Sequence, residues 1–172
     1  LIDISASTAN CQSDGDVCYE IGGKGKVSKE SIRIAYSLVD GLKKSNEVGV
    51  VAYSDDSYLV AEPQSLSFSR EAIKSKISKI SPSGPSYHDL GLRGGAQLAE
   101  ENDTVVMLSD GKIGSYSRSN IAFKTRNEAN AMDAKLITVG MGEDPNEPLL
   151  EDIAETTEGY YLENSETGRL KF

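Results

Sequence analysis

Short apolar runs alternate along this chain with longer segments in which apolar residues recur every three or four positions. Four runs rich in β-branched residues predict central strands that are buried on both faces of a sheet. They lie at residues 1–4, 48–53, 105–108 and 136–139. Shorter runs at 58–61 and 160–162 predict two flanking strands. Strands that alternate with helices in this way are typical of an α/β domain with a mainly parallel, doubly wound sheet and helices on both faces.

One edge of the predicted sheet differs from the rest. Only residues 54–57 separate the strand at 48–53 from the one at 58–61, which is too short a connection for a crossover helix. These two strands are therefore predicted to form an antiparallel hairpin. The other connections are long enough for helices and are expected to be right-handed crossovers.

Five helices are predicted between these strands. Ser28, Ser69 and Asp89 are the predicted N-caps of the first three, because their side chains accept hydrogen bonds from free backbone N–H groups. The last two are predicted over residues 121–132 and 148–157, and a proline opens the second of them.

The charge of the chain bears on its partners. The net charge of −9 disfavours attraction to nucleic acid or to an anionic membrane surface. No apolar run approaches the roughly 20 residues of a membrane span, so direct membrane insertion is not expected. Arg70, Lys74, Lys76 and Lys79 are expected to form the solvated face of a helix without a function of their own.

Candidate chemistry lies where two of the central strands end. Asp3, Ser5 and Ser7 place a carboxylate and two hydroxyls at alternate positions where the first strand ends, and Asp110 follows the strand at 105–108. Open α/β sheets bind ligands at this carboxyl edge. Oxygen donors of this kind suit a hard cation such as Mg²⁺.

These residues resemble the metal-ion-dependent adhesion site of the von Willebrand factor A family. That site joins the motif D-x-S-x-S, here at residues 3–7, to a threonine from a second loop and an aspartate after a central strand. Residues 84–92 are similar to the second loop of integrin-type members, with Ser86 in the place of the threonine. The resemblance covers nearly the whole chain. It implies a Rossmann-like fold and a site for Mg²⁺ or Mn²⁺, with Ca²⁺ less suited.

The register of the second loop stays open at this point. Aligning Gly91 with the motif T-D-I-G of bacterial members would put His88 in the ligand position instead of Ser86. A histidine nitrogen suits zinc or nickel better than magnesium. Ser86 keeps a hydroxyl ligand but lacks the methyl group that restricts the threonine rotamer.

The resemblance implies a metal-dependent protein-binding module for adhesion or assembly that captures an acidic residue, Asp or Glu, of a partner protein. One alternative is an intracellular domain of the same family that works with an AAA+ ATPase, and another is a structural domain without a metal-mediated ligand. An enzyme is not expected, because the chain has one histidine, no G-x-S-x-G motif, and no histidine near its cysteines in sequence.

The remaining expectations concern context. Residues 1–172 fit a single domain, and the abrupt start before Asp3 is interpreted as a first strand without its opening residues, so that this is a piece of a longer chain. Residues 8–27 are expected to form a long irregular loop in which Cys11 and Cys18 close a disulfide. A disulfide would favour an extracellular or cell-surface location, whereas free thiols would favour the cytoplasm.

Overall fold

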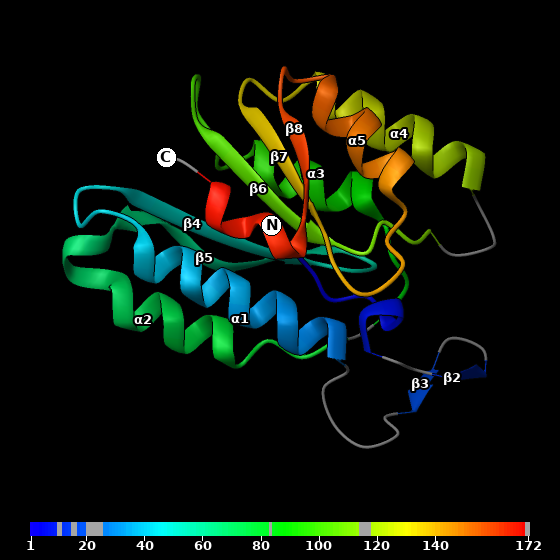
Figure 1. Ribbon diagram of the computed structural model, residues 1–172, viewed down its shortest axis with the longest axis horizontal. Coiled ribbons are helices and arrows are strands. Elements are labelled where there is room, and N and C mark those ends of the chain that lie inside the picture. The colour runs from blue at the N-terminus through cyan, green and yellow to red at the C-terminus, as the bar shows by residue number, and fades with distance from the viewer. Residues whose placement is uncertain (10–11, 15–16, 20–25, 83, 114–117, 171–172) are drawn as a thin grey trace.

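The fold is a six-stranded sheet with helices on both faces (Figure 1), in a computed structural model that describes residues 1–9, 12–14, 17–19, 26–82, 84–113 and 118–170. The strand order is β5-β4-β1-β6-β7-β8. The bounds are β1 Ile2–Asp3, β4 Glu47–Tyr53, β5 Ser57–Ser65, β6 Thr104–Ser109, β7 Lys135–Gly140 and β8 Tyr160–Glu163. All neighbours are parallel except β4 and β5, which confirms the predicted antiparallel edge.

Five α-helices within the described part of the chain cover the sheet. They are α1 Lys26–Gly41, α2 Leu66–Ser78, α3 His88–Ala96, α4 Arg118–Asn130 and α5 Glu147–Glu155. One core cluster packs Ile34 of α1 and Ile73 of α2 against the sheet, whereas a second contains Leu92, Ala129 and Leu150 of α3, α4 and α5. The two clusters therefore lie on opposite faces, as the arrangement of helices in Figure 1 also shows.

The start of α2 differs from the prediction. Its N-cap is Ser65, whose side chain accepts a hydrogen bond from the backbone N–H of Ser67. The backbone N–H of Leu66 donates a hydrogen bond to the carbonyl of Asn46, so the turn that leaves β5 determines where the helix begins. Ser69, the predicted cap, lies one turn inside the helix, and its hydroxyl donates to the Ser65 carbonyl at 2.7 Å.

Two other predicted caps are also wrong. Helix α1 begins at Lys26, so Ser28 lies inside its first turn. The N-cap of α3 is Tyr87, and Asp89 is an acidic residue in the first turn of that helix. A carboxylate there still interacts favourably with the helix dipole, although it does not cap the backbone.

The segment predicted as an irregular loop contains short elements. After β1 the chain forms a 3₁₀ helix, η1 Ala6–Ala9, and then a small antiparallel hairpin of β2 Gln12–Asp14 and β3 Val17–Tyr19, which stands apart from the main sheet in Figure 1. A second 3₁₀ helix, η2 Asn164–Arg169, follows β8. Cys18 belongs to β3, but Cys11 lies outside the described residues, so the predicted disulfide stays a prediction.

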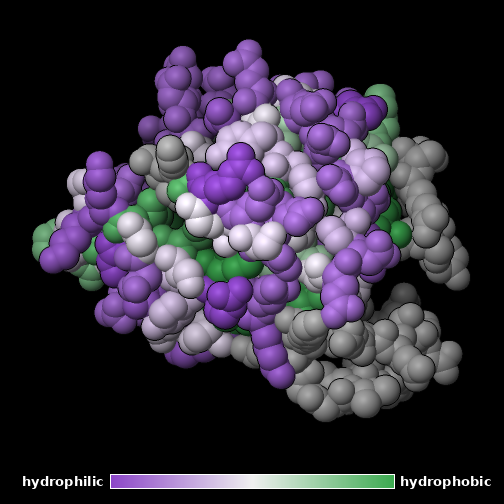
Figure 2. Space-filling view, viewed as in Figure 1, coloured by the Kyte–Doolittle hydropathy of each residue, from purple (hydrophilic) through white to green (hydrophobic). Residues whose placement is uncertain are grey.

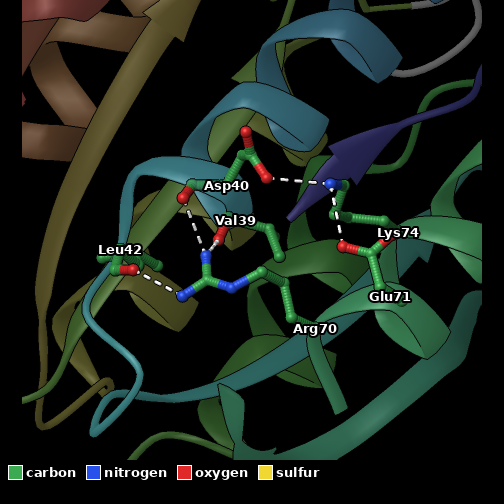
Figure 3. A network of polar contacts seen from close by, with 6 residues as sticks. All are labelled: Val39, Asp40, Leu42, Arg70, Glu71 and Lys74. Carbon is green, nitrogen blue, oxygen red and sulfur yellow. Dashed lines mark hydrogen bonds and ion pairs between the residues drawn. The ribbon is translucent and has the colours of Figure 1, made fainter. Parts of the chain in front are cut away.

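The basic residues of α2 do not form one solvated face. Lys74 is only 7% exposed and donates to the Asp40 carboxylate at 2.8 Å and to the Glu71 carboxylate at 3.1 Å. Arg70 donates to backbone carbonyl oxygens at the end of α1 (Figure 3). Only Lys76 and Lys79 are exposed as predicted.

Hydrophilic residues predominate on the face that Figure 2 shows, and hydrophobic residues are visible between them in the middle of the view and at its margins. Among the described residues, no helix has both the length and the apolar character that crossing a membrane would require.

Candidate metal centre

The candidate site lies at the carboxyl ends of β1 and β6, the two central strands. Asp3 is the last residue of β1, and Asp110 directly follows β6. Because Ile2 pairs with Leu108, Asp3 comes to lie beside Ser109. The Ser109 hydroxyl donates to Asp3 Oδ2 at 2.6 Å, and both side chains are fully buried. The sheet register thus joins residues that are 106 positions apart in the chain.

The first loop brings two serine hydroxyls to this edge. The backbone N–H of Ser5 donates to Asp3 Oδ1 at 2.9 Å, and the backbone N–H of Thr8 donates to the Ser5 carbonyl at 3.0 Å. These bonds turn the chain out of the strand and into η1. As a result the hydroxyls of Ser5 and Ser7 lie 3.0 Å apart, with Ser5 buried and Ser7 exposed.

The second loop contributes Ser86. Its position is fixed by the next residue, because the backbone N–H of Tyr87 donates to the carbonyl of Ser54 at the end of β4. Ser86 Oγ lies 3.4 Å from Asp3 Oδ2 and 2.9 Å from Nδ1 of His88. The spacing of the second loop allowed either Ser86 or His88 in the ligand position. In the structure Ser86 contacts the Asp3 carboxylate, and His88 contacts Ser86.

The third segment is the turn after β6. Gly111 adopts a φ of 66°, in the left-handed region that favours glycine, and its N–H donates to Ser109 Oγ at 2.9 Å. Asp110 Oδ1 accepts a hydrogen bond of 3.0 Å from the backbone N–H of Lys112. The tight turn keeps the Asp110 side chain at the edge of the sheet, where it is 3% exposed.

The electrostatics of this edge favour a cation. Burial raises the pKa of Asp110 above its usual range, and the charge of Asp3 raises it further; backbone and Ser7 hydrogen bonds act in the opposite direction. None of the ion pairs among the described residues includes Asp3 or Asp110. Two buried carboxylates therefore share this edge without an ion-pair partner from the described part of the chain.

Beneath the site lies a pair of buried rings. Tyr53 of β4 and His88 of α3 meet edge to face, with ring centroids 5.8 Å apart. Burial and the charge of Asp3 raise the pKa of the Tyr53 phenol well above its usual value, so it is neutral. Within the described residues, Tyr53 Oη and His88 Nε2 are two of the three buried side-chain polar atoms without a hydrogen-bond partner.

The donor set fits a hard divalent cation. Asp3 and Asp110 supply charge, and Ser5, Ser7 and Ser86 supply neutral oxygens. The described residues contain no cluster of three or more His, Cys, Asp or Glu side chains placed as metal ligands, so the candidate donors are the two carboxylates and the three hydroxyls.

Sequence reasoning missed Ser109 and Tyr53. Ser109 directly precedes Asp110, and the parallel register of β1 and β6 would have placed it beside Asp3. Tyr53 ends the strand on the other side of β1, where it pairs with Asp3. Both would have been found by asking which residues end the two strands that flank Asp3.

The fold and this edge define a class: a doubly wound α/β domain with acidic and hydroxyl side chains gathered at the carboxyl end of its sheet. The family model of the von Willebrand factor type A domain matches residues 1–171, and the chain belongs to that family. A search of curated proteins gave no match.

Solved structures with the same fold come from varied proteins. An aerotolerance-related membrane protein from Bacteroides fragilis is 17% identical, with a TM-score of 0.71 over 98% of this chain and 92% of that one. The PilB minor pilin from Streptococcus sanguinis is 13% identical, with a TM-score of 0.75 over 98% of this chain and 57% of that one. Proximal thread matrix protein 1 from the mussel byssus, solved with zinc in its metal-ion-dependent adhesion site motif, is 20% identical, with a TM-score of 0.69 over 98% of this chain and 44% of that one.

Proposed function

We propose that this domain binds a divalent cation, Mg²⁺ or Mn²⁺, at the edge formed by β1 and β6 and uses it to bind another protein. The observation that carries the proposal is the pair of buried carboxylates, Asp3 and Asp110, which have no ion-pair partner among the described residues. Burying two like charges together is costly unless a cation offsets them.

The five proposed donors have different roles in binding the cation. Ser5, Ser7 and Ser86 act as direct hydroxyl ligands, while Asp3 and Asp110 bind directly or through water. When bound, the cation supplies a positive focus for an incoming oxygen atom. Ser7 is exposed while the other four donors are buried, so the site opens to solvent on the Ser7 side.

The partner is expected to contribute an aspartate or glutamate. Hard divalent ions prefer carboxylate oxygen over nitrogen or sulfur. The chain carries a net charge of −9, so an acidic partner would be repelled without the cation. Binding is therefore expected to depend on the metal completely, and Ca²⁺, which is larger, is expected to substitute poorly.

We propose a binding role rather than catalysis, at the cell surface or outside the cell. The family assignment and the mussel protein's zinc-occupied site support metal binding. The only histidine of the chain is buried and bonded to Ser86, which leaves it poorly placed as an acid or base for a substrate in solution.

The test compares metal binding by the native protein and by Asp3→Ala in isothermal calorimetry. The native protein should bind Mg²⁺ and Mn²⁺, and the variant should lose more than about 100-fold in affinity, because even residues behind metal ligands contribute about 10–100-fold. The matched control is Asp133→Ala, which removes an exposed carboxylate just before β7, at the opposite end of the sheet. Equal binding by native protein and Asp3→Ala would refute the site.

A second experiment tests the partner by capturing proteins from a native extract on this domain, with Mg²⁺, Ca²⁺ or EDTA present. A captured protein should be released by EDTA and retained poorly in Ca²⁺. Changing its acidic residues one at a time to alanine should identify a single residue whose loss abolishes binding. Undiminished capture in EDTA would leave the metal site intact and would favour a structural domain.

A further inference from the structure

His88, the first residue of α3, is a second polar neighbour of the Ser86 hydroxyl besides Asp3. Its Nδ1 is 2.9 Å from Ser86 Oγ, an ordinary hydrogen-bond distance, whereas the contact of that oxygen with Asp3 Oδ2 is 3.4 Å. A distance of 3.4 Å is long for a bond between a hydroxyl and a carboxylate. Nδ1 of His88 is therefore the nearer of the two partners, and it accepts the Ser86 hydroxyl proton when the ring carries its own proton on Nε2.

The direction of that proton decides what Ser86 offers to a cation. A serine hydroxyl has one proton and two lone pairs. When the proton points to His88, both lone pairs of the oxygen are directed elsewhere and remain available to a cation. When the proton points to Asp3 instead, it lies between the Ser86 oxygen and one oxygen of a carboxylate that would hold the cation.

The imidazole is held firmly in its place. His88 is fully buried, is the first residue of α3, and packs against the Tyr53 ring at an interplanar angle of 81°. The same tyrosine ring lies against Gly91, where an added Cβ would come within 2.5 Å of it. The absence of a side chain at Gly91 therefore lets β4 and α3 approach closely enough to clamp the imidazole.

Serine needs such a partner more than threonine does. Two heavy atoms on Cβ restrict the χ1 angle of threonine, while serine has only one and rotates more freely. Ser86 lacks the methyl group that would restrict its rotamer.

We infer that His88 is a positioning residue for the metal site: its Nδ1 accepts the hydroxyl proton of Ser86 and holds the serine with its lone pairs toward the cation. This inference rests on the proposed metal-binding function and adds to it a residue that is not itself a ligand. His88 replaces, with a hydrogen bond, the restraint that a threonine methyl would supply by sterics.

The experiment compares Mn²⁺ and Mg²⁺ affinities of four variants with the native protein. His88→Phe keeps a ring but removes the acceptor and should weaken binding about 10-fold, the effect typical of a residue behind a ligand. His88→Asn, which retains a short acceptor, should stay within about 3-fold of native. Adding Ser86→Thr to His88→Phe should restore most of the lost affinity, because the methyl then fixes the rotamer.

The fourth variant, Ser86→Thr alone, should change affinity by less than about 3-fold, because His88 already fixes the native serine. A large gain in this variant would contradict the inference even if His88→Phe failed to fold. Native affinity in His88→Phe would overturn it, as would a loss that Ser86→Thr does not restore. Absence of Mg²⁺ and Mn²⁺ binding by the native protein would instead refute the proposed function itself.

A second readout needs no variant. His88 is the only histidine of the chain, so its imidazole ¹⁵N signals can be assigned directly. In the Mg²⁺-saturated protein they should report a proton on Nε2, with Nδ1 as the acceptor. A proton on Nδ1 under these conditions would mean that His88 donates to Ser86, and it would overturn the inference.

Discussion

Two regions of this domain contain charged side chains in contrasting surroundings, and they differ in whether those charges have partners within the chain. Between α1 and α2, Arg70 and Lys74 lie against acceptors that the chain itself provides (Figure 3). At the carboxyl edge of the sheet, Asp3 and Asp110 are buried beside hydroxyl groups and each other, and no ion pair among the described residues includes them. One region is neutralised internally, and the other is left anionic.

The neutralised region joins two helices. Arg70 donates to the carbonyl oxygens of Val39, Asp40 and Leu42, which the end of α1 leaves without helical partners. The hydrogen bond and the charge of Lys74 lower the pKa of the Asp40 carboxyl. Every charge here has a partner of opposite sign or a dipole, so the region stabilises the fold and requires nothing from outside.

The difference teaches where a ligand is needed. The buried Lys74 ammonium lies between two carboxylates, so a buried charge in this domain has partners of opposite sign. The carboxylates of Asp3 and Asp110 at the sheet edge have no such partner among the described residues. Perturbed, unpaired charge of this kind is characteristic of binding sites. The following predictions test the contrast, in order of the expected change in the free energy of unfolding.

The largest effect should come from the metal. Mg²⁺ at about 100 times its dissociation constant should raise the free energy of unfolding by about 2.7 kcal/mol, because it binds the folded state alone. Urea denaturation with and without Mg²⁺ measures this. Asp40→Asn, in the neutralised region, should show the same Mg²⁺ increment as native protein, whereas Asp3→Ala should show none.

The next largest change in the free energy of unfolding should come from the loss of Arg70. Arg70→Met keeps much of the apolar stem but leaves carbonyl oxygens of α1 without a charged donor, so stability should fall by about 2 kcal/mol. Metal affinity, measured by calorimetry, should not change. Lys79→Met, which removes an exposed cation at the C-cap of α2, is the control and should unfold like the native protein. Weaker metal binding by Arg70→Met would show that the two regions are coupled.

Asp110→Asn should stabilise the metal-free protein while removing metal binding. Because the pKa of Asp110 is raised in the folded state, its ionised form costs stability at neutral pH, and the cost disappears as pH falls through that pKa. The amide oxygen can still accept from the Lys112 N–H, so we expect a gain of about 1 kcal/mol at pH 7. Thermal unfolding in EDTA measures it, and a loss of stability would contradict the description of this edge as uncompensated.

The smallest effect concerns the exposed end of the neutralised region. The pKa of Asp40 is lowered in the folded state, so its stabilising effect is present above the unfolded value of about 3.9 and is lost as pH falls through the folded value. Asp40→Asn should therefore be less stable than native protein at pH 7, and the difference should disappear as pH falls through the folded pKa of Asp40. Unfolding curves at a series of pH values measure this, and Asp133→Asn, at an exposed carboxyl outside the neutralised region, is the control.

Much of the fold could be predicted from the sequence, because strand and helix patterns depend on local periodicity. The caps could not. Ser65, Ser67 and Ser69 are all chemically suitable, and the bond between Leu66 and Asn46, far apart in sequence, selects the first. The burial of Lys74 was missed for a similar reason, since its partner Asp40 belongs to another helix.

The candidate site divides in the same manner. Asp3, Ser5, Ser7 and Asp110 could be placed at one edge because each lies at or just beyond the end of a central strand. The second loop has no such anchor, and spacing alone allowed either Ser86 or His88 to face the first strand. The hydrogen bond from Tyr87 to the end of β4 sets the register and puts Ser86 beside Asp3.

The contact between Ser86 and His88 also has a consequence for how this family varies. If a hydrogen-bond acceptor at position 88 and a methyl group at position 86 are two ways to restrain one hydroxyl, neither position evolves independently. A mutation from serine to threonine relaxes selection on the histidine, and loss of the histidine selects for threonine. Positions 86 and 88 should therefore covary among homologous domains, with serine accompanied by an acceptor and threonine accompanied by a wider range of residues.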